Sequence, residues 1–329
     1  MNNFTTRLWR KAFFLQFLVG FLLVGSGVLH AQESTVPTGS FAVRPAKVEL
    51  IAEPGEQITR NIEIANGTGL PLSIVVSYED IAPKTQAVAT EDAVSLLGEE
   101  RGEYPLSELM STTKKSFRLV SGEAMSVPVT VTIPKDAPPG GLYGSVVFTF
   151  KPIFSKDSTE SQNIAIESRL ASLFFVRVAG ETREEGEIAA FGLFNQEKYL
   201  KQPSRDKPLR FQVAYTNAGN VHLNPYGRMV VSSTFGNDVE VVIDPWVVLP
   251  GATRMRELNV HNALSPGFYT AKLEQNRGYQ DIVDERVVSF WILPNTTQWA
   301  IMLIVLLATT LLVRRSLKLS KHFVSTSST

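Results

Sequence analysis

The sequence predicts an all-β protein with two tandem Ig-like β-sandwich domains and one C-terminal transmembrane helix. Three observations support this prediction. Apolar side chains alternate with polar ones over most of the chain, as they do in strands that bury one face. Gly, Pro and Asn interrupt these stretches at short intervals, which is typical of antiparallel sandwiches. A charge-free apolar segment near the C-terminus, followed by basic residues, is typical of a membrane span.

Residues 1–31 have the plan of a secretory signal peptide. Arg7, Arg10 and Lys11 precede a mostly apolar run, and small residues lead to a cleavage position at Ala31. The apolar run is long, so a retained N-terminal anchor is the alternative interpretation. The signal peptide predicts that the rest of the chain is exported.

The C-terminal apolar segment, residues 299–313, is the predicted transmembrane helix. It is shorter than the roughly 20 residues that a bilayer core prefers, but Trp299 suits the headgroup level and Arg314 and Arg315 can snorkel. The tail, residues 314–329, is basic and has no Asp or Glu. The positive-inside rule therefore predicts a single-pass protein of the cell membrane, with a cytoplasmic C-terminus and the bulk of the chain extracellular.

Charge and cysteine content exclude several classes of function. Lys plus Arg and Asp plus Glu both number 32, but basic residues gather at the two ends, so the body between them is acidic. An acidic exported body predicts no nucleic-acid partner. The chain has no cysteine, which excludes thiol catalysis, thiolate metal sites and cysteine lipidation.

The alternating segments divide into two halves. We predict a first Ig-like domain over residues 40–180 and a second over 186–295. The segment Glu181–Glu187 carries five charges and is the predicted linker. It shows no apolar pattern that joins the halves, so each half is expected to fold by itself. The alternating strands are Leu72–Tyr78, Val127–Ile133, Val146–Phe150, Phe174–Val178, Phe211–Tyr215, Val239–Ile243 and Tyr269–Leu273.

The two halves share a plan, which indicates two copies of one type of domain. Each contains in the same order an Asn after a strand, a Gly turn and a Pro-Gly-Tyr element: Asn66, Gly122 and Tyr143, then Asn217, Gly251 and Tyr269. The Asn positions predict tight turns with positive φ angles. Both Tyr residues are placed like the tyrosine corner of Ig-type sandwiches, in which the hydroxyl ties the turn to the strand.

The first half carries an insertion near residues 84–116, where it is 22 residues longer than the second between matched elements. Two interpretations stay open: a functional loop, or a packed segment that covers a sheet edge. For the functional loop, a set of apolar side chains is expected to contact a partner: Leu96, Leu97, Leu106, Leu109 and Met110.

No motif in the sequence marks a catalytic, cofactor-binding or metal-ligating residue, and the residues of any binding site stay unknown. His222 and His261 have no second His or Glu at metal-ligand spacing, so we expect turn or surface residues. Catalytic motifs are absent, and we expect no cofactor and no enzymatic activity; an unmarked carboxylate pair remains open. Trp246 and Trp291 lie in strand contexts and are expected in the core, with exposed sugar-binding faces as the alternative.

Two short motifs add a resemblance to a known family. The first half contains Phe-Arg-Leu-Val-Ser-Gly-Glu at residues 117–123 and Pro-Lys-Asp-Ala-Pro-Pro-Gly at residues 134–140. With a signal peptide, two Ig-like domains and a C-terminal anchor, the chain resembles the WxL-interacting protein family of bacterial surfaces. The resemblance implies that the first domain is associated with peptidoglycan and the second with host-surface proteins, with wall-attached WxL proteins as partners and no catalytic residues.

The leading functional hypothesis is a membrane-anchored extracellular scaffold or adhesion protein that binds a cell-wall polymer or an envelope protein. It combines the predicted export, the anchor, the paired sandwiches and the lack of a catalytic motif. Two alternatives remain: a cell-envelope hydrolase that uses an unmarked carboxylate pair, and a structural accessory subunit of an envelope complex.

Overall fold

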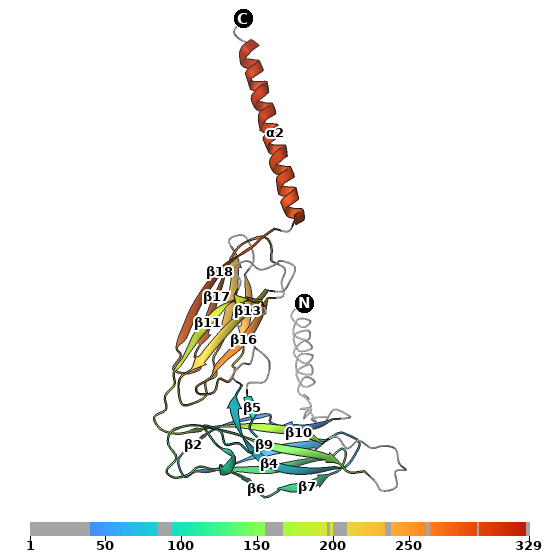
Figure 1. Ribbon diagram of the computed structural model, residues 1–329, viewed down its shortest axis with the longest axis vertical. Coiled ribbons are helices and arrows are strands. Elements are labelled where there is room, and N and C mark those ends of the chain that lie inside the picture. Colours follow the sequence, from blue (N-terminus) through green and yellow to red (C-terminus); the bar gives the residue numbers. More distant parts are fainter. Residues whose placement is uncertain are drawn as a thin grey trace, which may run out of the picture.

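The computed structural model describes residues 40–84, 94–154, 167–195, 198–199, 209–233, 238–260, 264–294 and 296–326. They form two Ig-like β-sandwiches in series and one C-terminal helix, as Figure 1 shows. The predicted fold class is confirmed. The predicted signal peptide, residues 1–31, and residues 85–93 of the insertion lie outside the described residues.

The first sandwich consists of two sheets with the core between them. One sheet has the order β1 (Phe41–Arg44), β3 (Gln57–Asn66), β8 (Ala124–Thr132), β6 (Met110–Thr112). The other has the order β2 (Lys47–Ala52), β10 (Ser168–Val178), β9 (Gly140–Pro152), β4 (Leu72–Pro83), β5 (Val94–Leu96), and β7 (Ser116–Leu119) also pairs with β4. β2 runs parallel to β10, whereas β9 and β4 pair antiparallel. A short 3₁₀ helix, η1 (Ser107–Leu109), precedes β6.

The second sandwich repeats this two-layer plan with four strands in each sheet. The first sheet has the order β12 (Lys198–Tyr199), β11 (Gly186–Asn195), β13 (Leu209–Asn217), β16 (Thr253–Val260). The second has the order β15 (Val239–Ile243), β14 (Tyr226–Ser233), β17 (Gly267–Asn276), β18 (Val283–Ile292). The alternation in the sequence sets which face is buried: along β8, Val127, Val129 and Val131 point into the core.

The shared Asn positions have the same role in both sandwiches, and it goes beyond the predicted turn. Both side chains are fully buried at the end of a strand, and neither residue has a positive φ. Asn66 Nδ2 donates to the carbonyl oxygens of Leu70 (2.8 Å) and Leu119 (3.0 Å). Asn217 Nδ2 donates to the equivalent oxygens, at 2.8 and 2.9 Å. The predicted turns are present, because Asn66 Oδ1 accepts from Thr68 N at 3.0 Å and Asn217 Oδ1 accepts from Gly219 N at 2.9 Å, but the positive φ angles predicted for the Asn residues are absent. Each Asn also joins two chain segments through its amide, and the buried position is stable because the amide is satisfied.

The described part of the insertion is built into the first sandwich. β5 extends one sheet beyond β4, and β6 extends the other beyond β8, so both short strands occupy sheet edges. Leu106 and Met110 are buried in the core, so the expectation that they contact a partner is wrong. Leu96 remains exposed.

The two sandwiches contact each other through side chains outside the charged linker. Ile81, Tyr143 and Phe175 lie on the outer face of the first sandwich and form an apolar cluster with Leu249 of the second. Gly141 N donates to the carbonyl oxygen of Asn220 at 2.8 Å. Figure 1 shows the second sandwich standing across the first at this junction. The predicted linker lacks apolar residues, but the domains nevertheless share an apolar contact.

The C-terminal helix α2 (Thr296–Thr326) extends away from the second sandwich (Figure 1). It contains the predicted span and continues into the basic tail, so it is longer than predicted. Thr297–Arg315 is long and apolar enough to cross a membrane, and none of it is buried against the rest of the protein. The helix is compatible with a single-pass anchor by length and composition.

Candidate binding site

A cleft of about 490 Å³ lies at the junction between the two sandwiches. Both domains contribute to it, and its walls combine apolar side chains with two basic residues. The lining residues are Ala46, Lys47, Val94, Leu96, Ala171, Leu173, Phe175, Pro245, Trp246, Val247 and Arg254. An apolar cleft with a few polar groups at a domain boundary is the usual form of a binding site.

The wall from the first sandwich follows from strand alternation. Leu173 and Phe175 are two residues apart on β10, so both point out of the same face of the sheet. Val94 and Leu96 have the same spacing on β5, which pairs with β4 at the edge of that sheet. The first part of the insertion thus provides an apolar rim for the cleft.

The wall from the second sandwich is centred on Trp246, which follows β15. The indole is 6% exposed, and Arg254 and Arg256 from β16 lie at 5.5 and 6.0 Å from its ring centroid. Each arginine also donates to a backbone oxygen of this segment: Arg254 Nη1 to Val247 O at 2.7 Å, and Arg256 Nη1 to Asp244 O at 2.6 Å. These contacts hold the arginines over the indole by cation–π attraction and hydrogen bonds.

The polar groups of this wall are not fully matched within the described chain. Neither Arg254 nor Arg256 forms an ion pair with a described residue, and the buried Trp246 Nε1 has no hydrogen-bond acceptor there. Burial, and next the adjacent Arg256, lowers the pKa of Arg254. Because two adjacent cations without a described counter-charge are unfavourable, a carboxylate from a ligand would be stabilised beside Arg254.

Lys47 is the second basic residue of the cleft, and it already has a partner. Its Nζ contacts Glu49 Oε1 at 2.8 Å. Burial raises the pKa of Glu49, but Lys47, His222 and Asn224 outweigh this and hold the pKa below its usual value. Lys47 is therefore balanced inside the protein, and the positive charge of the cleft that no described carboxylate balances lies at Arg254.

The junction next to the cleft contains His222, which is packed between aromatic rings. Its ring centroid lies 5.7 Å from that of Tyr143 and 5.4 Å from that of Phe175. Burial is the main cause that lowers its pKa to about 4, although Glu49 opposes the shift. His222 lies in the turn segment between β13 and β14, as expected, but its ring packs into the junction, while His261 lies outside the described residues.

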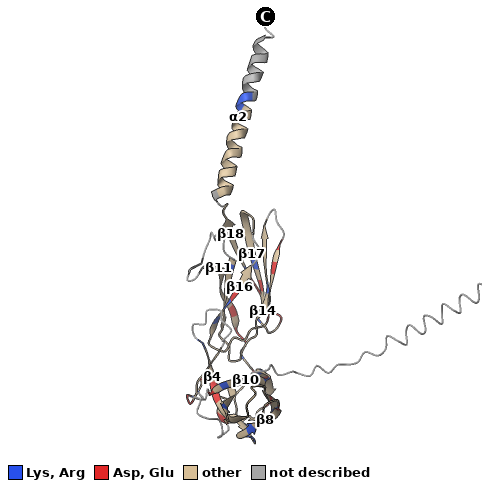
Figure 2. Ribbon diagram, turned by 90° about the vertical axis from the view of Figure 1, so that its right-hand side faces the viewer, with Lys and Arg blue, Asp and Glu red and all other residues tan. Residues whose placement is uncertain are grey.

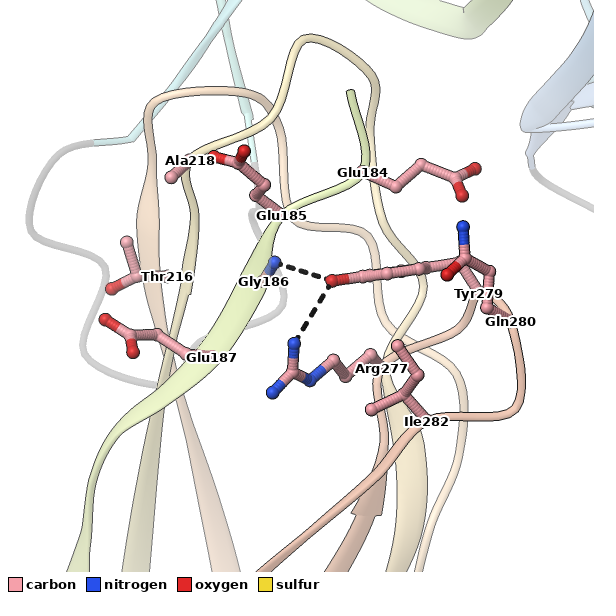
Figure 3. Close-up of a pocket in the computed structure, with 10 residues that line it drawn as sticks. All are labelled: Glu184, Glu185, Gly186, Glu187, Thr216, Ala218, Arg277, Tyr279, Gln280 and Ile282. Atoms are coloured by element: carbon pink, nitrogen blue, oxygen red, sulfur yellow. Dashed lines mark hydrogen bonds between the residues drawn. The ribbon is translucent and has the colours of Figure 1, made fainter. Parts of the chain in front are cut away.

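A second pocket, of about 380 Å³, lies where the linker meets the β17–β18 turn, and Figure 3 shows its residues. The Tyr279 hydroxyl accepts from Gly186 N at 3.0 Å and lies next to Arg277. Arg277 in turn forms a two-point contact with Asp284, at 2.7 and 2.8 Å. These groups satisfy one another, so the pocket joins the turn to the linker and has less free capacity for a ligand than the cleft.

Two buried carboxylates in the first sandwich have structural partners. Asp80 accepts from Gly102 N, Leu106 N and Ser107 N at 2.8–3.0 Å, and these bonds outweigh burial and lower its pKa. Glu79 accepts from Gly98 N at 3.1 Å and pairs with Arg169. Both carboxylates hold the insertion against β4. Among the described residues, no cluster of His, Asp and Glu is suited to a metal ion.

The two tryptophans expected in the core differ. The prediction is confirmed for Trp246, which is buried, and wrong for Trp291, which is 53% exposed on β18. Nothing in the sequence predicts Arg254 or Phe175 as site residues. No local spacing marks them, because the cleft forms only when segments from both halves meet.

Comparisons with known proteins give matches among solved structures. No protein-family model and no curated protein matches the chain. Among solved structures, the class 5 fimbriae chaperone CfaA is 12% identical, covering 78% of this chain and 100% of its own, with a TM-score of 0.37. The E. coli chaperone DraB is 12% identical over 77% of this chain and 98% of its own, with a TM-score of 0.35. A chain of the CsuC–CsuE chaperone–tip adhesion subunit complex from Acinetobacter baumannii is 8% identical over 78% and 100%, with a TM-score of 0.36.

Proposed function

We propose that the chain is a membrane-anchored binding scaffold that holds an envelope protein in the cleft between its two sandwiches. The observation that carries this proposal is the composition of the cleft, where the exposed apolar side chain of Leu96 shares the lining with Arg254, which forms no ion pair with a described residue. A segment with an apolar side chain next to a carboxylate would satisfy both requirements. A wall-attached protein is the class of partner that the resemblance to the WxL-interacting family implies.

Binding fits the described site better than hydrolysis does. Glycoside hydrolysis needs two carboxyl groups that face a shared substrate. The buried carboxylates of Glu79 and Asp80 instead accept backbone N–H groups and an arginine within the protein. The cleft itself is lined by apolar and basic side chains. A scaffold role for the cleft requires no chemistry at these positions.

The proposal is tested by photocrosslinking in intact cells. p-Benzoylphenylalanine replaces Leu96 at the rim of the cleft, and in a matched control it replaces Val242, an exposed residue of β15 outside the cleft. We expect one protein to be crosslinked from position 96 and not from position 242. Mass spectrometry should locate the crosslink in a segment that has an acidic residue near an apolar one.

A charge reversal tests the role of Arg254. Arg254→Glu should reduce the crosslinking yield from position 96 by about tenfold, because one buried charge contact is worth at least 1.4 kcal/mol. Arg286→Glu, on the exposed strand β18, makes the same charge change and should leave the yield unaltered. Equal effects of the two reversals, or equal crosslinking from positions 96 and 242, would contradict a binding site in the cleft.

A further inference from the structure

The outer face of the second sheet in the second sandwich changes in character along its length. Its end near the first sandwich carries an ion-pair network, in which Arg228 contacts Glu274 at 2.8 Å and Lys272 contacts Glu274 and Glu285 at 2.8 and 2.9 Å. These charged groups satisfy one another in water. The other end of this face is the end that leads to α2. It carries none of these charged residues.

The end next to α2 carries an exposed aromatic pair. Phe268 and Trp291 are directly opposite each other on β17 and β18, and their ring centroids lie 5.0 Å apart. They are 41% and 53% exposed, so each ring leaves a large surface uncovered. Single exposed apolar residues are ordinary, but two adjacent aromatic rings form a patch that needs an explanation.

The position of the pair along the chain indicates what covers it. β18 ends at Ile292, and only Leu293, Pro294 and Asn295 separate it from α2. At about 3.5 Å per residue, the chain from Trp291 to the start of the span at Thr297 reaches at most roughly 20 Å. No Asp, Glu, Lys or Arg occurs from residue 287 to residue 313. Figure 2 shows α2 free of charged residues from its start up to one blue band.

We infer that Phe268 and Trp291 lie against the phospholipid headgroups and fix the orientation of the second sandwich on the membrane. Trp is favoured at this level because it combines an apolar ring with a polar N–H, and Phe adds apolar area beside it. The charged network lies farther along the sheet, where it remains in water. This inference rests on the proposed membrane anchor, because it needs α2 to span a bilayer.

The chain has no cysteine, so single-cysteine probes report depth directly. Three variants of the full chain are labelled with the fluorophore NBD and reconstituted in phosphatidylcholine vesicles. The first variant is Ser289→Cys, on β18 two residues from Trp291. The second is Val242→Cys, on β15 across the sheet, and the third is Thr309→Cys, within α2. Lipids with a headgroup nitroxide should quench NBD at position 289 by roughly half, because that level is the interface. NBD at position 242 should be unaffected, and lipids brominated in the acyl chain should quench NBD at position 309.

Replacing the aromatic pair tests its own contribution. In Phe268→Ser/Trp291→Ser, quenching at position 289 should fall to the level at position 242 while quenching at position 309 is unchanged. Circular dichroism checks the fold, and Trp291→Ser alone serves if the double variant unfolds. Quenching at 309 without quenching at 289 would overturn the membrane contact and leave the anchor intact. No quenching at 309 would overturn the anchor. A change in NBD fluorescence at position 289 that depends on protein concentration and not on lipid would assign the patch to a second copy. That result would also overturn the inference.

Discussion

The two sandwiches use the same buried asparagine but differ in the use of their Pro-Gly-Tyr element. Asn66 and Asn217 make equivalent amide bonds within their own domains. Tyr269 donates to Ser265 O at 2.9 Å, so the predicted tyrosine corner is confirmed in the second sandwich. Tyr143 instead packs its ring against His222 of the other sandwich. The shared framework thus fixes each fold, and a position that one domain uses internally serves the contact between domains in the other.

The largest expected loss of stability that is specific to one domain comes from replacing Asp80. The described part of the second sandwich has no buried carboxylate. Asp80→Ala removes the acceptor of three backbone N–H groups, so the free energy of unfolding of the first domain should fall by about 4 kcal/mol. Asp80→Asn keeps an acceptor oxygen and should cost less. Hydrogen exchange by mass spectrometry on the full chain in detergent should show faster exchange over residues 98–110. Unchanged exchange there would show that the insertion does not depend on Asp80.

Replacing Asn66 and replacing Asn217 are expected to destabilise their own domains by equal amounts. Asn66→Ala and Asn217→Ala each leave two backbone oxygens without a buried donor, which should destabilise the affected domain by about 3 kcal/mol. Urea unfolding monitored by exchange in each domain measures both effects, with Asn224→Ala, whose Nδ2 reaches Glu49 at 3.4 Å, as a weak-contact control. A clear effect in only one domain would show that the shared geometry has unequal energetic roles.

The contact between domains should weaken in mild acid. The folded pKa of His222, about 4, lies below the ordinary value of 6.5, so protons bind preferentially when the junction is open. Stability is therefore complete above about pH 6.5 and decreases as the pH falls toward 4. This predicts a loss of about 2 kcal/mol between pH 7 and pH 5. Glu49 opposes the shift, whereas Lys47 and Arg177 add to it.

The control for this pH dependence keeps an aromatic ring at the junction. His222→Phe removes the titrating group, so its urea midpoint should change less between pH 7 and pH 5 than that of the unmodified protein. The difference between the two slopes isolates His222 from the carboxylates, which titrate in both proteins. Parallel slopes would mean that His222 is already accessible to protons in the folded chain.

The strands can be predicted from the sequence, but the junction between the two sandwiches cannot. Alternation predicts the buried face of β8 because it depends only on neighbours along the chain. The role of Asp80 depends on N–H groups 22 to 27 residues away, which no local pattern reveals. Trp291 has the apolar context of a core residue, but β18 lies at the edge of its sheet and the side chain points outward. The cleft combines β5, β10 and β16, so its composition follows from tertiary contact alone.

The buried Asn66 also affects how the protein ages chemically. In an unfolded chain, Asn followed by Gly is prone to deamidation, because the unhindered nitrogen of Gly67 attacks the side-chain amide and ammonia leaves. The folded chain restrains both partners: Gly67 N donates to Ser40 O at 2.7 Å, and Asn66 Nδ2 is held by two carbonyl oxygens. In the second sandwich, Ala218 follows Asn217, and its methyl group hinders the same attack. Folding therefore protects the more labile of the two asparagines, and damage at Asn66 accumulates with the time that the first domain spends unfolded.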